Sequence, residues 1–311
     1  MDKKMSFFTI AFLSIIVTAC LPSSTPKTEP APPAGSGTTT TATGVKKRAI
    51  QNIGSDTMVN LAQAWAEDFK KIRRDVSVEV AGPGSAVGIA NLINGTADLV
   101  NSSRKMSAGE MAQAKNNNPG KEPREFIVGF DGLAVYVHKD NPLEELTLEQ
   151  IGEIYKMRGT ADKWSQLGVD AKKICSSDEI VRYSRQSNSG TYKYFQEAVL
   201  HKGDFRSGSL DLHGSKDVVE AVGKTPCSIG YSGMAYKTPE VKFVKVAKKK
   251  GDPALAPSNE TVLSGAYPIA RPLLLYTLGE PAGDLKDYID WILSPAGQEV
   301  IAKVGYTPLK K

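Results

Sequence analysis

Apolar residues recur along most of the chain at spacings that alternate between those of helices and those of strands. Between positions 59 and 72 they fall three or four residues apart, as at Val59, Ala62, Trp65 and Phe69, which predicts one buried face of a helix. The segment Val76–Val80 alternates apolar and polar residues, which predicts a strand. A turn at residues 54–57 comes before this first helix.

The same two patterns follow one another along the rest of the chain. Strands are expected near 97–100, 126–138, 180–183, 228–231 and 267–278, and helices near 86–94, from 107, and near 147–155, 191–199, 215–222, 285–293 and 295–304. Strands that alternate with helices favour an α/β fold with mostly parallel sheets flanked by helices. In such sheets ligands bind beyond the carboxyl ends of the strands.

Cap signals mark where three of these helices begin. Ser107 with Glu110, and Thr147 with Gln150, have the spacing of a capping box. Ser294 provides a capping hydroxyl, and Pro295 follows it at the first helical position, where proline is favoured.

The N-terminal segment is expected to be a signal peptide covering residues 1–19. Lys3 and Lys4 precede an apolar stretch, Phe7–Val17, that is too short to span a bilayer. The stretch ends in Val17-Thr18-Ala19-Cys20, which resembles the lipobox of bacterial lipoproteins. The resemblance implies cleavage before Cys20 and a lipid anchor on its thiol, holding the protein on the periplasmic or extracellular face of a bacterial membrane. Simple secretion, with Cys20 as a bystander, is the alternative.

Residues 20–47 are expected to form a flexible linker. Pro, Thr, Ser, Ala and Gly dominate this segment, so it lacks the apolar surface needed to fold. The folded part is expected to begin near Ala49.

Composition excludes several classes of function. The 311 residues carry a formal net charge of +5, and the basic run Lys248–Lys250 is typical of a solvated loop, so no nucleic-acid surface is expected. Three His and three Cys show no metal-ligand spacing, so neither a metal nor a cofactor is expected. Once Cys20 is acylated, Cys175 and Cys227 remain as a pair in an exported chain, which predicts a disulfide; two buried thiols are the alternative.

The segment Ile180–Leu200 combines features of an anion site. Its pattern predicts a strand, a polar turn at 186–190, and a helix from Thr191. Free amide groups and the helix dipole would then point at one place. Arg185 stands before the turn and offers a planar fork of donors suited to an oxyanion. An ordinary helix cap beside a surface Arg is the alternative.

Other segments share this plan of small hydroxyl residues before a helix or after a strand. They are Gly54–Met58, Gly82–Ala86, Ser189–Thr191 and Ser102–Arg104. Converging amides and hydroxyls can hold a dehydrated oxyanion without a metal. Several such turns in one chain, together with Arg185, favour a tetrahedral-anion site over a set of unrelated helix caps.

At these residues the chain resembles the phosphate-binding lipoproteins of Pst-type phosphate ABC transporters, which are class II solute-binding proteins. The likeness runs from about Ile50 to the C-terminus. Its markers are Gly54–Met58, Gly84-Ser85, Ile93–Asp98, Ser102–Arg104, Arg185 with Ser189–Thr191, and Ile229–Tyr231.

The resemblance implies a two-lobed class II periplasmic-binding-protein-like fold with two crossing hinge strands, and capture of inorganic phosphate between the lobes for delivery to membrane ABC permease subunits. Residues 48–133 and 268–311 would form lobe I, and 134–267 lobe II. Such a trap works as a monomer and is not an enzyme. The implied phosphate contacts are Thr57, Met58, Ser85, Arg185, Ser189, Gly190 and Thr191.

Two positions depart from the family pattern. Ser103 stands where many members have an Asp that accepts the phosphate proton, and Ser187 stands where many have an acid after the Arg. Serine does not repel a fully ionised anion as a carboxylate does. Asp56 is then either the missing acceptor or a cap of the first helix.

Three other functions remain to be weighed. A hydrolase using Ser189 would need a His base and a Gly-x-Ser-x-Gly turn, and Asn188-Ser189-Gly190 lacks that pattern. A binding protein for sulfate, molybdate or another oxyanion would use the same kind of turns. A surface adhesin or sensor could reuse the fold.

Overall fold

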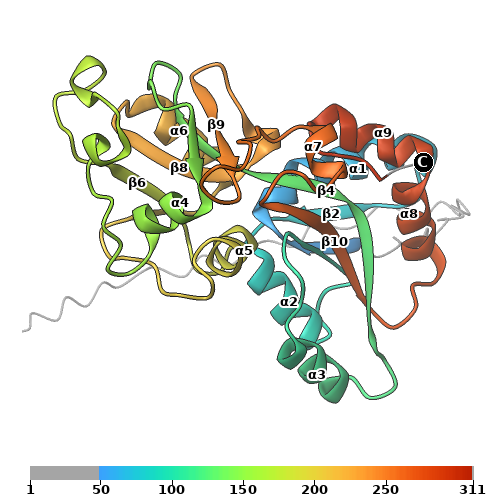
Figure 1. Ribbon diagram of the computed structural model, residues 1–311. Helices are drawn as coiled ribbons and strands as arrows, with labels where there is room; N and C mark the ends of the chain where they lie inside the picture. Colours follow the sequence, from blue (N-terminus) through green and yellow to red (C-terminus); the bar gives the residue numbers. More distant parts are fainter. Residues whose placement is uncertain (1–48, 310–311) are drawn as a thin grey trace, which may run out of the picture. The chain divides into compact units, whose positions relative to one another are not determined.

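The computed structural model describes residues 49–309 (Figure 1). The expected signal peptide (1–19), the lipidated Cys20 and the linker (20–47) lie outside the described residues.

A curled mixed sheet runs through the described part of the chain. The strand order is β2-β1-β3-β10-β4-β8-β6-β7, with β9 beside β4 and β5 beside β9. The strands are β1 (Ile50–Gly54), β2 (Val78–Ala81), β3 (Leu99–Ser102), β4 (Pro123–His138), β5 (Glu145–Thr147), β6 (Val181–Arg185), β7 (Leu210–Leu212), β8 (Ser228–Gly233), β9 (Val241–Ala247) and β10 (Ala270–Leu278).

Helices cover both faces of the sheet (Figure 1). They are α1 (Val59–Ile72), α2 (Ser85–Ile93), α3 (Ala108–Asn117), α4 (Leu148–Tyr155), α5 (Gly190–Ala198), α6 (Ser215–Lys224), α7 (Asn259–Leu263), α8 (Gly283–Leu293) and α9 (Pro295–Val304). Short 3-10 helices occur at η1 (Asp56–Met58), η2 (Trp164–Leu167), η3 (Ala171–Lys173) and η4 (Met234–Tyr236). The α/β fold expected from the sequence is confirmed.

Strand direction separates the outer strands from the two long ones. β1 is parallel to β2 and β3, β6 is parallel to β7 and β8, and β5 is parallel to β9. β10 is antiparallel to β3 and β4, and β4 is antiparallel to β8 and β9. The expected parallel pairing therefore applies to the outer strands, whereas the long strands make the sheet mixed.

β4 connects two parts of the sheet. Its residues 123–132 pair with β10, and its residues 133–138 pair with β8 or β9. We call the part made of β1, β2, β3, β10 and the start of β4 the β1 half, and the part made of the end of β4, β5, β6, β7, β8 and β9 the β8 half. β4 thus passes from one half to the other, as the long green strand in Figure 1 shows.

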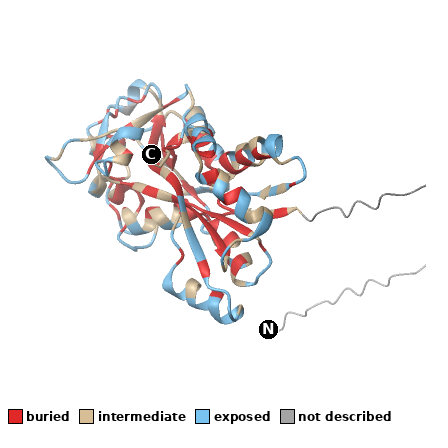
Figure 2. Ribbon diagram, turned by 90° about the vertical axis from the view of Figure 1, so that its right-hand side faces the viewer, coloured by how far each residue is buried: buried red, intermediate tan, exposed pale blue. Residues whose placement is uncertain are grey.

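Each half has its own hydrophobic core. In the β1 half, Trp65, Phe69 and Tyr288 belong to a cluster between the sheet and α1, α8 and α9, and Leu92 and Tyr276 to a cluster under α2 and α3. In the β8 half, a larger cluster includes Tyr155, Trp164, Phe195 and Tyr231. Figure 2 shows buried residues along the strands and exposed residues on the outer faces of the helices.

The predicted helix starts are confirmed. Ser107 with Glu110, and Thr147 with Gln150, form complete capping boxes at α3 and α4. The Ser294 side chain accepts a hydrogen bond from the Gly297 amide at the start of α9. Within residues 49–309, no helix combines the length and the apolar character that crossing a membrane requires.

Candidate functional site

The turns singled out in the sequence meet where the two halves face each other. From the β1 half come η1, which follows β1, the start of α2, and Ser103, which follows β3. From the β8 half come Arg185, the last residue of β6, and the start of α5. These residues lie at or just beyond the carboxyl ends of their strands, where α/β sheets bind ligands.

Buried hydroxyl groups connect the two halves at this point. Thr57 and Thr191 place their Oγ1 atoms 2.7 Å apart, although they are 134 positions apart in sequence. Both side chains are at most 1% exposed. At this distance one hydroxyl donates a hydrogen bond to the other, and both oxygens keep lone pairs that can accept from a further partner.

Serine hydroxyls form a second buried group beside the first. Ser55 Oγ donates to Ser103 Oγ at 2.9 Å, and the Ser103 amide donates to Ser85 Oγ at 3.2 Å. All three residues are at most 1% exposed. Ser85 and Ser103 were predicted from the sequence as site residues but Ser55 was not, although Ser55 lies in the Gly54–Met58 turn that was singled out.

Gly190 allows the start of α5 to approach these serines. A Cβ atom at this position would lie 2.3 Å from Ser85 Oγ and 2.6 Å from Ser103 Oγ. Any other residue would therefore push the two halves apart here. The neighbouring Thr191 amide donates to Ser189 Oγ at 3.1 Å, which makes Ser189 the N-cap of α5.

A second close approach lies between the turn before α2 and the turn before α5. The Ala86 amide donates to the Asn188 carbonyl at 3.1 Å, and Asn188 Nδ2 donates to the Pro83 carbonyl at 3.0 Å. Gly84 has φ of 113°, and a Cβ there would lie 2.7 Å from the Asn188 oxygen. The turn requires glycine at this position both for its conformation and for space.

Arg185 is buried rather than exposed on the surface. Its side chain is 1% exposed, and its Nη2 donates to Asp56 Oδ1 at 3.0 Å. Nη1 donates to Ser215 Oγ at 2.7 Å, and Nε and Nη2 both donate to the His213 carbonyl. Burial lowers the pKa of Arg185 and the Asp56 carboxylate opposes that shift. Arg185 is therefore not the surface Arg of the alternative, whereas the helix cap that the alternative expected is present at Ser189.

Asp56 faces the β8 half instead of its own helix. Its Oδ1 also accepts a hydrogen bond from the Ser215 amide at 2.6 Å, at the first residue of α6. A carboxylate at a helix N-terminus is stabilised by the helix dipole. Asp56 thus binds Arg185 and the start of α6 at once, and the structure gives it no role as the cap of the first helix.

The residues that hold Arg185, Asp56 and Thr57 in place were not identified from the sequence. Ser215 and His213 bind Arg185, and Tyr236 OH donates to the carbonyls of Asp56 and Thr57, each at 3.1 Å. Tyr306 OH also donates to the Thr57 carbonyl. Gly214-Ser215 before a helix repeats the plan of the other turns, which is the signal that could have identified Ser215.

Two residues from the predicted motifs point elsewhere. The Met58 side chain is buried in the hydrophobic core of the β1 half, and its amide donates to the Ser55 carbonyl at 3.1 Å. Arg104 makes a two-pronged ion pair with Glu110, at 2.7 and 2.8 Å. Arg104 is therefore not part of the buried hydroxyl cluster.

Ser187, the second departure from the family pattern, is exposed. It lines a surface pocket of about 300 Å³ with Ala86, Arg104, Lys105 and Lys193 among its neighbours. It makes no contact with Arg185 among the hydrogen bonds of residues 49–309. The carboxylate that pairs with Arg185 is Asp56, from the opposite half.

A fully buried ion pair joins the two long strands next to this cluster. Asp131 on β4 and Arg271 on β10 are directly opposite each other, and both side chains are fully buried. Arg271 Nη2 and Nε donate to Asp131 Oδ2 at 2.7 and 3.0 Å. Burial raises the pKa of Asp131, while the charge of Arg271 opposes that rise.

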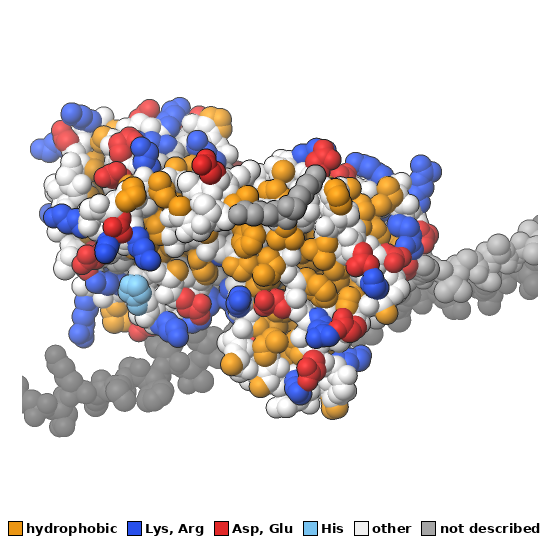
Figure 3. Space-filling model, turned by 45° about the vertical axis from the view of Figure 1, so that its right-hand side comes forward, with side chains coloured by type: hydrophobic (Ala, Val, Ile, Leu, Met, Phe, Trp, Pro, Cys, Tyr) orange, Lys and Arg blue, Asp and Glu red, His pale blue; other side chains and the backbone are white. Residues whose placement is uncertain are grey.

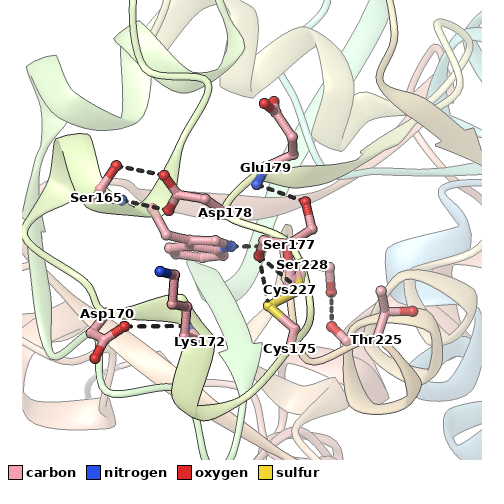
Figure 4. The surroundings of a disulfide bond; sticks show 11 residues. Ser165, Asp170, Lys172, Cys175, Ser177, Asp178, Glu179, Thr225, Cys227 and Ser228 are labelled. Atoms are coloured by element: carbon pink, nitrogen blue, oxygen red, sulfur yellow. Dashed lines mark hydrogen bonds between the residues drawn. A yellow bond between two sulfur atoms is a disulfide. The ribbon is translucent and has the colours of Figure 1, made fainter.

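Cys175 and Cys227 form a disulfide in the β8 half (Figure 4). Their Cα atoms are 5.8 Å apart, within the usual range for a bridge. Trp164, fully buried, donates from Nε1 to the Cys227 carbonyl at 3.1 Å. The bridge therefore ties the segment before β6 to the segment before β8.

Two further properties of the described residues are their capacity to hold a metal ion and the distribution of their surface charge. Among residues 49–309, no group of three or more His, Cys, Asp or Glu side chains is placed to hold a metal ion. On the face drawn in Figure 3, cationic and anionic side chains are interspersed rather than gathered by sign.

Comparison with known proteins gives consistent similarities. A family model described as a PBP superfamily domain matches residues 31–296. The chain is 37% identical over 270 residues to the phosphate-binding protein PstS of Pseudomonas aeruginosa, covering 84% of this chain and 83% of that protein. It is 31% identical over 269 residues to the phosphate-binding protein PstS of Staphylococcus saprophyticus, covering 84% and 81%.

Solved structures show the same relationship. The fold is similar to that of a putative phosphate ABC transporter substrate-binding protein with bound phosphate from Clostridium perfringens, with a TM-score of 0.72 and 31% identity over 85% of this chain and all of that one. An ABC-type phosphate transport receptor from Vibrio cholerae, 24% identical, shares the fold with a TM-score of 0.66 over 84% of this chain and all of that one.

Proposed function

This chain belongs to the PBP superfamily, a family of solute-binding proteins rather than enzymes, and on that premise we propose that it captures inorganic phosphate outside the cytoplasm and delivers it to an ABC permease. The relatives named as phosphate-binding proteins support the ligand. So does the similar solved structure with bound phosphate.

The observation that carries the proposal is the meeting of Thr57 and Thr191, from opposite halves, at a point connected to the buried Arg185. Arg185 Nη1 donates to Ser215 Oγ, which in turn donates to Thr57 Oγ1 at 3.3 Å. Hydroxyl groups and helix-start amides can replace the hydration shell of a tetrahedral anion, and a guanidinium balances its charge. The proposed phosphate contacts are Asp56, Thr57, Met58, Ser85, Ser103, Arg185, Ser189, Gly190 and Thr191. Met58 would contribute its backbone amide, since its side chain lies in the core; that amide would have to share or give up its hydrogen bond to the Ser55 carbonyl when phosphate binds.

Asp56 is the proposed source of selectivity. Phosphate near neutral pH keeps at least one proton, since the related phosphate esters have a second pKa of about 6, whereas sulfate keeps none. A carboxylate near the anion rewards that proton and repels a fully ionised ligand. Asp56 is the carboxylate that lies within the cluster, in contact with Arg185.

Capture would depend on movement of two lobes. We propose that residues 48–133 with 268–311 form one lobe and residues 134–267 the other, and that the chain segments crossing between them act as the hinge. The contact between Thr57 and Thr191, one from each proposed lobe, supports a ligand position between them.

Attachment and partners follow from the sequence motif and the family. We propose that a lipid on Cys20 anchors the protein to the membrane, and that residues 20–47 hold the folded part away from it. The protein would act as a monomer and dock on the membrane subunits of the permease.

Calorimetric titration of the purified protein with phosphate, arsenate, sulfate and molybdate tests this proposal. We expect phosphate, and arsenate as its closest analogue, to bind, and sulfate and molybdate to bind far more weakly. Sulfate binding as tight as phosphate binding would reduce the assignment to a general oxyanion-binding protein. Absence of binding by all four anions would contradict it.

A further inference from the structure

The buried ion pair between Asp131 and Arg271 lies where the two halves join. The two residues are cross-strand neighbours on β4 and β10, and neither side chain is exposed to solvent. Removing two charges from water costs several kcal/mol per ion unless geometry and further hydrogen bonds compensate. The further contacts of this pair therefore indicate what it does.

Arg271 reaches from the long strands into the serine group of the candidate site. Its Nη1 donates to the Ser103 carbonyl at 3.2 Å. The other polar groups of Ser103 are also engaged, because its amide donates to Ser85 Oγ and its hydroxyl accepts from Ser55 Oγ. Arg271 is thus the only charged side chain among the hydrogen-bond partners of Ser103 within residues 49–309, and it holds the backbone from which the hydroxyl projects.

The same pair also contacts the β8 half. The Arg271 guanidinium lies over the Tyr194 ring, 5.5 Å from its centre, and Tyr194 OH donates to the Ala270 carbonyl at 2.6 Å. Asp131 Oδ1 accepts from the Met234 amide at 3.1 Å. Tyr194 belongs to α5, the helix whose first residues approach Ser103. The pair therefore touches both sides of the place where Ser103 meets Gly190.

We propose that Arg271, held in place by Asp131, is a positioning residue for phosphate binding that acts by fixing Ser103 against the start of α5. This inference rests on the proposed function, because it assigns a role within the same site. Arg271 itself does not contact the ligand. Its guanidinium fork is needed because one arm binds Asp131 while another binds the Ser103 carbonyl, which the single ammonium group of Lys does not reproduce.

The test uses variants that avoid an unpaired buried charge. Arg271→Gln alone leaves Asp131 buried without its partner, which is the strongly destabilising case. The main variant is therefore the double variant Asp131→Asn with Arg271→Gln, which leaves neither member of the pair as an unpaired buried charge. Phosphate affinity is measured by calorimetry, and folding by urea unfolding. We expect the folded double variant to bind phosphate at least about fivefold more weakly, the loss that corresponds to about one hydrogen bond.

A thermodynamic cycle with Ser103→Ala separates positioning from general stability. If Arg271 acts through the Ser103 hydroxyl, Ser103→Ala weakens phosphate binding by a similar factor, and adding the double variant to it changes affinity by less than about twofold. A purely structural pair would instead lower affinity equally in both backgrounds, and that result overturns the proposal. Wild-type affinity in the double variant or in Ser103→Ala overturns it as well.

Two further variants complete the experiment. Arg271→Lys keeps the positive charge, so full recovery of wild-type affinity would show that charge alone matters and would overturn positioning; we expect affinity to stay below that of the wild type. Arg124→Gln removes an exposed ion pair with Glu280 near the other end of the paired strands β4 and β10 and should bind like the wild type. Failure of the wild type itself to bind phosphate would count against the proposed function and not against this inference alone.

Discussion

Asp56 and Arg185 form an ion pair between the two halves of the protein, with 3.0 Å between Asp56 Oδ1 and Arg185 Nη2. The residues are 129 positions apart in sequence. The family resemblance places the acid that accompanies this Arg two residues after it, where this chain has Ser187. Arg185 is therefore paired with a carboxylate, as the family pattern implies, but the carboxylate comes from the opposite half. In this structure, the same two residues therefore join the halves and neutralise Arg185.

Arg185→Ala should weaken phosphate binding by at least about tenfold, which corresponds to about 1.4 kcal/mol. The reason is that charge-assisted hydrogen bonds contribute about 1.5–3 kcal/mol each. Arg185→Lys should recover only part of the affinity, since a point charge lacks the planar fork that binds His213, Ser215 and Asp56 together. Calorimetry measures both variants, and unchanged affinity in Arg185→Ala would remove this residue from the site.

Asp56→Asn should narrow the difference in affinity between phosphate and sulfate by at least about fivefold. The amide keeps an oxygen that can accept from the Ser215 amide and Arg185, but it loses the charge that repels a fully ionised anion. We also expect phosphate itself to bind more weakly. Competition titrations of the two anions measure the ratio. An unchanged ratio would reduce Asp56 to a structural partner of Arg185 and α6.

Gly190→Ala should lower the affinity for phosphate by at least about tenfold, while the protein stays folded. Alanine favours a helix start at least as well as glycine does, but its Cβ would lie within 2.6 Å of the Ser85 and Ser103 hydroxyl oxygens. Gly109→Ala in α3 is the matched control, because the nearest atom to its new Cβ, Ser107 Oγ, is 4.0 Å away. Equal affinity in both variants would show that α5 does not approach the serines in solution.

Loss of the Cys175–Cys227 disulfide should lower the free energy of unfolding by about 2–4 kcal/mol. The bridge closes a separation of 52 residues, for which the chain-entropy model gives about 4 kcal/mol. Urea unfolding of Cys20→Ser protein with and without reductant measures the difference. In the same variant, which has no other cysteine, a thiol reagent should label nothing in unfolded, unreduced protein; labelling of two thiols would contradict the bridge.

Cys20 should carry a lipid, because it follows the Val17–Ala19 segment of the predicted signal peptide. Each buried CH₂ of an acyl chain contributes about 0.8 kcal/mol to membrane binding. The wild type should enter the detergent-rich phase on partitioning, and Cys20→Ser should remain in the aqueous phase. Both proteins in the aqueous phase would rule out the anchor.

Local signals in the sequence predicted the helices well, because a helix start depends on residues three positions apart. Ser107, Thr147 and Ser294 act as caps where their spacing indicated. The long strands were also predictable. The stretches 126–138 and 267–278 are mostly apolar and are longer than an ordinary strand, so they stand out in the sequence. The strands β1, β5, β7 and β9 and the helix α7 were missed. For β5, β7 and α7 the reason is that three to five residues carry too little periodicity.

For the candidate site, the sequence indicated the kinds of residue but not how they pair. Small hydroxyl residues before a helix indicated Thr57, Ser85, Ser189 and Thr191. Nothing in the local sequence indicates that Asp56 pairs with a residue 129 positions away. The same limit applies to Asp131 and Arg271, which read as single charged residues within two apolar strands until the register of β4 and β10 sets them opposite each other.

The position of β10 between β3 and β4 determines when the chain can finish folding. The ribosome makes β3 and β4 early, but both keep unpaired edges facing one another until residues 270–278 arrive. The helix α1 likewise waits for its partners, since Trp65 donates to the Gly297 carbonyl and Phe69 packs on Tyr288. The half that begins the folded chain is therefore the last to be completed. A chain threaded through a membrane from its N-terminus thus stays incompletely folded until its final helices have crossed.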